Sequence, residues 1–244
     1  MLRGLVAGGL VAGTGLTLGG AGPAAAATPG GLPRGTRSTS GAQTLLAPTS
    51  PGLAEAELMA GNARWVDQLQ THPNENAARR NLVATGQHPW AMVVSCIDSR
   101  VPPELIFDQG LGDLFVCRTA GPVLDNAVLA SASYAATKTD VKLIVVLAHE
   151  NCGAIDYALG REDGSPAYPP PHAVDLEWLY AHIKPIIPPA STPDRVNVTT
   201  ERNIKRVRDQ LLGEYNVSQR VTAGSLNVIS ARYDLNTWAV TKVL

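Results

Sequence analysis

The sequence predicts an α/β fold: a mostly parallel central sheet flanked by helices, with an N-terminal helical arm and antiparallel strands at the C-terminal edge. Two short apolar runs, Ala91–Ser95 and Lys142–Ala148, stop abruptly at polar residues, which is typical of buried parallel strands. A helical segment lies between them, from about Val123 to Thr137. Because strands that alternate with helices form parallel crossover units, these three segments indicate a sheet covered on both faces.

The helical arm is expected over Leu53–Gln70, where apolar residues recur at helical spacing. We expect this apolar face to pack against the core rather than to carry chemistry. Its members are Ala54, Leu58, Trp65, Val66 and Leu69. The strand Ala91–Ser95 then leads into a polar loop over residues 96–100, after which Pro102 and Pro103 can begin a helix.

A second strand is expected over Leu114–Cys117, and it leads through residues 118–121 into the helix around 123–137. The run Lys142–Ala148 is the strongest strand signal in the chain. Polar residues directly follow the first and third strands, where open α/β sheets usually build their sites.

The C-terminal half begins with a proline-rich insertion, Asp163–Pro171, and a helix expected over Ala173–Lys184, which Pro185 ends. A second helix is expected over Pro193–Leu212. The closing segment Ser225–Val243 holds two β-like runs separated by turn residues. This pattern predicts an antiparallel hairpin at the edge of the sheet.

The N-terminus has the pattern of a secretory signal over residues 1–27: Arg3, an apolar glycine-rich run, and small residues before a cleavage site near Ala27. Residues 28–50 are rich in Thr, Gly, Pro and Ser and are expected to form a disordered linker. We therefore expect one catalytic domain over residues 51–244 and a secreted or extracytoplasmic protein. The alternatives are a disordered leader on a cytoplasmic protein, or a membrane anchor, although many glycines disfavour a stable membrane span.

The net charge and the number of cysteines limit the classes of function that this chain can have. The 20 Lys and Arg residues and 21 Asp and Glu residues give a formal net charge of -1, so nothing attracts the chain to nucleic acid or an anionic membrane. A small or neutral substrate fits better. The three cysteines are an awkward number for disulfides, whereas two metal thiolates plus one unpaired thiol account for them economically.

A candidate zinc site consists of three residues that follow the first and third expected strands: Cys96, His149 and Cys152. Zinc prefers thiolate and imidazole ligands, and a catalytic site needs three protein ligands and one open position. The alternative is two buried small side chains and a satisfied core histidine, because H-x-x-C alone is a short pattern. The combination of all three residues favours the metal.

Asp98 and Arg100 follow the first of these cysteines and are the candidate catalytic residues. Arg100 can take the Asp98 carboxylate in a two-bond geometry, which would keep the carboxylate off the metal and its fourth position free. If the pair breaks, Asp98 can itself become a ligand in a closed state. The alternative is a plain ion pair that orders the loop.

These segments resemble the β-class carbonic anhydrase family. Cys96–Val101 is similar to its C-x-D-S-R signature, and His149–Gly153 is similar to its H-x-x-C-G signature. Between them, Gly112–Gly121 resembles the family segment that commonly reads G-D-x-F-V-x-R-N-A-G. The resemblance covers about residues 53–160 and resumes in the C-terminal part.

The resemblance implies zinc as cofactor and reversible hydration of carbon dioxide to bicarbonate and a proton. It further implies substrate-binding roles for Gln87, Phe115, Tyr134 and Gly153, and a plant-like, open site, since Val93 replaces the tryptophan of the other subtype. A dimer or a higher even oligomer is implied, with pocket residues contributed across the interface.

Two other functions stay open at this point. One is hydrolysis of carbonyl sulfide or carbon disulfide at the same zinc site, and the other is a zinc-binding module without turnover. No proton shuttle stands out, and we expect ordinary surface roles for His72, His88, His172 and His182. Cys117 is expected to be a buried thiol.

Overall fold

The computed structural model describes residues 47–168 and 174–243. These residues belong to one compact unit, Ser40–Leu244. The predicted signal over residues 1–27, most of the predicted linker, the end of the proline-rich insertion and His172 lie outside the described residues. Regular structure starts at Pro51, where the hydroxyl of Ser50 accepts a hydrogen bond from Leu53 N and caps the first helix.

The core is a sheet of five strands in the order β2-β1-β3-β4-β5. The first four pair in parallel, and β5 pairs with β4 in the antiparallel sense. Every residue of the two central strands is buried, which explains their continuous apolar runs. The strands are β1 (Ala91–Cys96), β2 (Leu114–Thr119), β3 (Leu143–His149), β4 (Asn227–Tyr233) and β5 (Val240–Val243).

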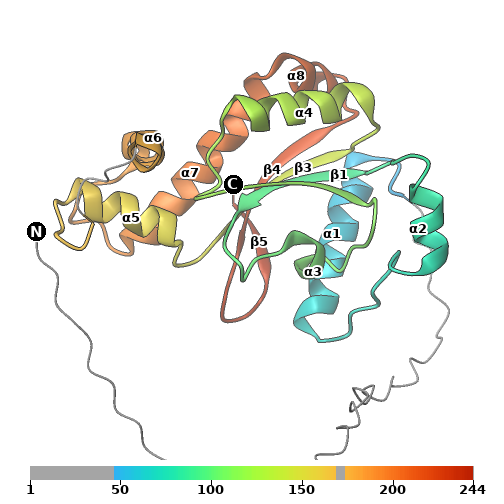
Figure 1. The fold of residues 1–244 in the computed structure, drawn as a ribbon, viewed down its shortest axis with the longest axis horizontal. Coiled ribbons are helices and arrows are strands. Elements are labelled where there is room, and N and C mark those ends of the chain that lie inside the picture. The colour runs from blue at the N-terminus through green and yellow to red at the C-terminus, as the bar shows by residue number, and fades with distance from the viewer. Residues whose placement is uncertain (1–46, 169–173, 244) are drawn as a thin grey trace, which may run out of the picture. The chain divides into compact units, whose positions relative to one another are not determined.

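Helices cover both faces of this sheet (Figure 1). One face packs against α1 (Pro51–Val66), α3 (Pro103–Ile106), α5 (Gly153–Glu162) and α6 (Val174–Ile183). The other packs against α4 (Asn126–Lys138), α7 (Arg195–Gly213) and α8 (Tyr215–Thr222). The predicted α/β architecture with a mostly parallel sheet is confirmed. Among the described residues, no helix is both long and apolar enough to cross a membrane.

The boundaries differ from the expected ones where burial is low. The arm helix ends at Val66 rather than Gln70, because Gln68 has a positive φ of 58° and Leu69 is 69% exposed. A 3-10 turn over Lys184–Ile186 follows α6 at the proline expected to end it. The C-terminal hairpin is antiparallel as expected, but its strand β4 also extends the parallel sheet beside β3.

Two short helices were not expected from the sequence. The first, α2 (Ala77–Val83), buries no residue, and α8 buries only Val217. With 7 and 8 residues, both are too short for the apolar repeat over several turns from which helices are predicted. Their capping residues, Asn76 and Glu214, were the available signals, since each side chain accepts a backbone hydrogen bond.

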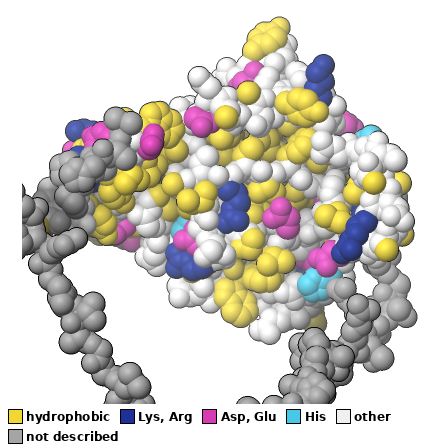
Figure 2. Space-filling view, in the orientation of Figure 1, with side chains coloured by type: hydrophobic (Ala, Val, Ile, Leu, Met, Phe, Trp, Pro, Cys, Tyr) yellow, Lys and Arg dark blue, Asp and Glu magenta, His cyan; other side chains and the backbone are white. Residues whose placement is uncertain are grey.

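In the face that Figure 2 shows, apolar side chains gather in the area between α4 and α3. Strand β2 is the last strand on its side of the sheet, so its outer edge is unpaired within the described chain. Large hydrophobic side chains on segments around this strand are exposed: Ile97, Leu105, Leu111 and Tyr134. An unpaired strand edge beside exposed apolar side chains is a common feature of interfaces.

Candidate metal centre

The candidate site lies where β1 and β3 end. Cys96 is the last residue of β1 and pairs with Thr119, and His149 is the last residue of β3 and pairs with Tyr233. Cys152 caps the N-terminus of α5 three residues later. Because parallel strands present their carboxyl ends at one edge of the sheet, residues far apart in sequence meet here.

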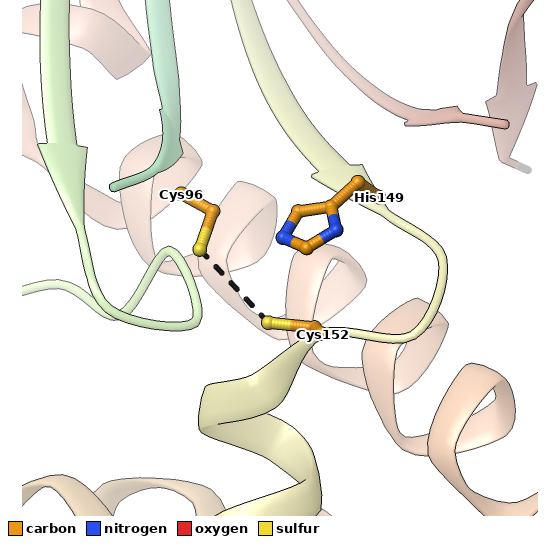
Figure 3. Close-up of side chains that lie close together, drawn as sticks. All are labelled: Cys96, His149 and Cys152. Carbon is orange, nitrogen blue, oxygen red and sulfur yellow. Dashed lines mark hydrogen bonds between the residues drawn. The ribbon is translucent and has the colours of Figure 1, made fainter. Parts of the chain in front are cut away.

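The three side chains point toward one another (Figure 3). Their donor atoms all lie within 4.8 Å of one another, and the two sulfurs are 3.9 Å apart. The exposed fractions are 3% for Cys96, 0% for His149 and 1% for Cys152. The structure therefore brings together the three residues that were predicted from the sequence as metal ligands.

A backbone carbonyl on the side away from the sulfurs orients the imidazole of His149. Its Nδ1 lies 2.8 Å from the carbonyl oxygen of Glu150, to which an N–H at that position donates. The other ring nitrogen, Nε2, is buried and has no hydrogen-bond partner. With its proton on Nδ1, the ring presents a lone pair at Nε2 toward the sulfurs, which is the arrangement of a metal ligand.

The two thiols differ in acidity because they are close together and buried. A hydrogen bond with the Cys152 side chain lowers the pKa of Cys96, although burial alone would raise it. Hydrogen bonds from His149 and from the amides of Asp98 and Gly121 lower this pKa further. The adjacent Cys96 sulfur and burial raise the pKa of Cys152. A second thiolate thus needs a cation beside it, and two thiolates with one imidazole are the donors that zinc prefers. The residues fit zinc.

Asp98 is held beside this cluster by Arg100. The guanidinium donates from Nε to Oδ1 at 2.9 Å and from Nη2 to Oδ2 at 2.7 Å, and the Arg100 amide also donates to Oδ1 at 2.9 Å. Arg100 lowers the pKa of Asp98 to about 2, so the carboxylate is ionised at neutral pH. Its Oδ2 lies 3.6 Å from His149 Nε2. The predicted pair is therefore formed, with one carboxylate oxygen facing the cluster.

Arg118 supports the same loop, although no pattern in the sequence assigned it a role. Its Nε donates to the carbonyl oxygen of Cys96 at 2.8 Å, and its Nη2 donates to the carbonyl oxygen of Asp98. A basic residue inside the otherwise apolar second strand was the signal in the sequence. Asn203 on α7 is a second missed residue: it is buried and donates to the carbonyl oxygen of Gly121 at 2.6 Å.

Three of the four predicted substrate-binding residues, Gln87, Phe115 and Tyr134, lie away from the ligands within one chain. Phe115 pairs with Met92 near the start of β1, so four residues, or roughly 13 Å of extended strand, separate it from the level of Cys96. The rings of Phe115 and Tyr134 contact each other edge to face, with centroids 6.4 Å apart. Gln87 is exposed and precedes β1, also away from its carboxyl end.

Gly153 is at the site, as the first residue of α5. It is exposed, and a Cβ atom there would meet no atom within 4 Å. Within one chain, no contact of the described residues demands glycine at this position.

The other histidines of the described chain and Cys117 lie outside the cluster, and Cys117 is less buried than expected. His72 and His88 are exposed, and His182 stacks on Trp178 with ring centroids 3.7 Å apart. Cys117 is half-buried, and burial raises the pKa of its thiol. All three cysteines of the chain lie in the described part, and none forms a disulfide.

Sequence comparisons with known proteins indicate the family of this chain. Residues 91–240 match the sequence model of the family described as carbonic anhydrase. Carbonic anhydrase 2 of Mycobacterium tuberculosis is 38% identical over 190 residues, which cover 77% of this chain and 90% of that protein. A carbonic anhydrase of Mycolicibacterium smegmatis is 50% identical over 115 residues, covering 47% of this chain and 56% of that protein.

Solved structures share the fold at low sequence identity. The β-carbonic anhydrase CcaA superposes with a TM-score of 0.59 at 22% identity, covering 77% of this chain and 94% of that chain. A Coccomyxa β-carbonic anhydrase in complex with acetazolamide has a TM-score of 0.59 at 24% identity, covering 81% and 87%. A tetrameric β-carbonic anhydrase of Sordaria macrospora has a TM-score of 0.58 at 23% identity, covering 75% and 93%.

Proposed function

Because this chain belongs to the β-carbonic anhydrase family, we propose that it is a zinc enzyme that reversibly hydrates carbon dioxide to bicarbonate and a proton. Membership of this family supports the assignment of carbonate dehydratase activity. The observation that supports zinc in this chain is the buried cluster of Cys96, His149 and Cys152, with its unpartnered His149 nitrogen.

These three residues would hold the metal. Bound zinc would supply a Lewis acid that makes water a nucleophile near neutral pH. The protein contributes the orientation of each donor: Glu150 O fixes the tautomer of His149, and Arg118 fixes the backbone that carries Cys96. The amides of Ile155 and Ala154, in the first turn of α5, act to lower the pKa of the Cys152 thiol by hydrogen bonding.

Asp98 would orient the attacking water. Its carboxylate stays ionised because Arg100 binds it, and it can therefore accept a hydrogen bond from a water beside the cluster. The same bonds restrain Asp98 from filling a position at the metal. The formed Asp98–Arg100 pair thus favours turnover over a zinc-binding module in which Asp98 closes the site.

The proposed product is an anion, and two positively charged or polarised groups lie beside the cluster. Helix α5 begins at Gly153, so the partial positive charge of its N-terminus lies directly after Cys152. The Arg100 guanidinium is about half exposed, with 52% of its side chain accessible. Both favour bicarbonate over carbon dioxide electrostatically.

We also propose that a second copy of this chain completes the pocket. Phe115, Tyr134 and Gln87 lie toward the opposite end of the sheet from Cys96, so in one chain they cannot line a slot beside the ligands. Tyr134 is 53% exposed, and β2 has an unpaired edge. The Sordaria macrospora enzyme that shares this fold is tetrameric, which agrees with assembly in even numbers.

Cysteine substitutions test the proposal with an internal control. Cys152→Ser should lose both zinc and carbon dioxide hydration, because a neutral hydroxyl is a poor zinc ligand. Cys117→Ser should keep both, since this half-buried thiol belongs to β2 and lies outside the three-residue cluster. Equal zinc content in Cys152→Ser and wild type would contradict the proposed site.

A further inference from the structure

Asn203 is a buried polar residue on α7 whose side chain reaches the loop beside the metal centre. Only 1% of it is exposed, and its Nδ2 donates to the carbonyl oxygen of Gly121 at 2.6 Å. Its Oδ1 accepts a hydrogen bond from Arg206 Nη2 at 3.1 Å. A guanidinium can only donate and a carbonyl oxygen can only accept, so both contacts require the same orientation of the amide.

Gly121 lies in the loop between β2 and α4 and has a positive φ of 63°. A Cβ atom there would come within 3.2 Å of Ala154 Cβ and 3.5 Å of Ile183 Cδ1. Ala154 belongs to the first turn of α5, directly after Cys152. The loop therefore packs closely against the segment that carries one of the proposed ligands, and both the short distance and the positive φ favour glycine at this residue.

The amide of Gly121 faces another proposed ligand. Together with the amide of Asp98, it lowers the pKa of the Cys96 thiol by hydrogen bonding. Hydrogen bonds to a ligating sulfur fix its position and tune how strongly it donates to a metal. Asn203 binds the carbonyl of the same glycine, so it holds the residue whose N–H contacts the sulfur.

We propose that Asn203 is a positioning residue for the metal centre, which holds Gly121 so that the amide of Gly121 faces the Cys96 sulfur. Arg206 keeps the Asn203 amide in the orientation that this contact needs. The inference rests on the proposed role of Cys96 as a zinc ligand. A purely structural role, in which Asn203 only satisfies a buried carbonyl, would affect folding stability but not the metal.

The test compares two isosteric substitutions at buried asparagines. Asn203→Asp keeps the size of the side chain but cannot donate to the Gly121 carbonyl. Asn62→Asp is the control: Asn62 is 5% exposed, and its Nδ2 donates to the carbonyls of Ile106 and Trp238, neither of which is one of the three proposed ligands. For each protein, the dissociation constant for zinc is measured by chelator competition, and the thiolate-to-metal charge-transfer band is recorded after substitution with cobalt.

We expect Asn203→Asp to weaken zinc binding roughly 10-fold to 100-fold and to shift the cobalt band. Arg206→Met leaves Asn203 intact and should change both in the same direction by a smaller factor. Asn62→Asp should lower the unfolding temperature but leave both metal readouts at the wild-type values.

Two results would overturn the inference alone: wild-type zinc affinity and cobalt band in Asn203→Asp, or equal changes in Asn62→Asp. A wild-type protein that binds no zinc would instead overturn the proposed function, and this inference with it.

Discussion

Arg100 binds both carboxylate oxygens of Asp98, with Nε 2.9 Å from Oδ1 and Nη2 2.7 Å from Oδ2. The oxygen bound by Nη2 is also the one that lies 3.6 Å from His149 Nε2. Two parallel bonds fix the plane of the carboxylate as well as its distance from the cluster. In the proposed mechanism, this pair keeps the Asp98 carboxylate available to the reaction and restrains it from filling a position at the metal.

Arg100→Gln should keep zinc but lose most of the hydration activity, about 100-fold, because a misplaced catalytic group costs about that much. Glutamine cannot bind both carboxylate oxygens with two donors on one plane. Zinc content and turnover are measured on the same preparation. Arg208→Gln is the matched control, since Arg208 pairs with Asp209 on the outer surface of α7. Wild-type turnover in Arg100→Gln would show that the pair only orders the loop.

Asp98→Ala should reduce hydration by roughly 100-fold or more, the usual contribution of a group that handles a proton in the transition state. The cluster of Cys96, His149 and Cys152 is unchanged in this variant, so zinc should stay bound. Asp140→Ala removes an exposed carboxylate that pairs with Lys142 and should have no effect. Full activity in Asp98→Ala would refute the role given to this residue.

A mixing experiment tests whether a second copy completes the pocket. The double substitution of Phe115 and Tyr134 to Ala and the single substitution Cys96→Ser should each be inactive alone. In a hybrid dimer, the Cys96→Ser chain supplies intact aromatic residues to the ligands of the other chain. Random exchange of subunits should therefore restore roughly one quarter of the wild-type activity per site. No recovery after verified exchange would place the aromatic residues outside the site.

Acid stability should depend on Asp108, whose side chain is 1% exposed. Burial acts to raise its pKa, but the Thr71 amide, the Arg64 guanidinium and the His72 amide together lower the pKa below 3.8. A lowered pKa in the folded state means that this contribution is fully present above pH 3.8 and is lost as the pH falls through the folded value.

Asp108→Asn should therefore destabilise the protein at neutral pH by about 1.5–3 kcal/mol, the usual value of hydrogen bonds to a charged group. It should also flatten the dependence of stability on pH below 3.8. Urea unfolding at a series of pH values measures both effects. Two parallel stability curves for the variant and wild type would contradict the assignment.

Export stays a prediction from residues 1–27, which lie outside the described structure. If the leader is a signal, the protein recovered from the medium should begin near Thr28. Sequencing of the mature N-terminus checks this directly. A secreted form that still begins at Met1 would show that no signal is removed.

The sequence predicted those parts of the fold that bury apolar residues in a regular pattern. Strands β1 and β3 were recognised because every residue in them is buried. Helix α2 buries nothing and was missed, because an exposed helix carries only a capping signal. The length of α1 was overestimated for a related reason: Leu69 matches the apolar spacing but is exposed in the structure.

The candidate site was predictable as far as its side chains reveal their chemistry. Cysteine and histidine at strand ends indicated the proposed ligands, and a nearby carboxylate with an arginine indicated the pair that the structure shows beside them. The contribution of Gly121 is a backbone amide, which has no signature in a sequence. Asn203 is separated from Gly121 by 82 positions, so its contact exists only after folding. Its one signal was a polar residue on the buried face of α7, next to Ile204 and Val207.

The most direct test of the central proposal is stopped-flow hydration of carbon dioxide by the wild-type protein across pH, with zinc measured in the same sample. We expect about one zinc per chain and rapid, saturable hydration, consistent with three ligands and an Asp98 carboxylate restrained by Arg100. A protein that carries one zinc per chain but does not hydrate carbon dioxide, even at alkaline pH, would contradict the assignment.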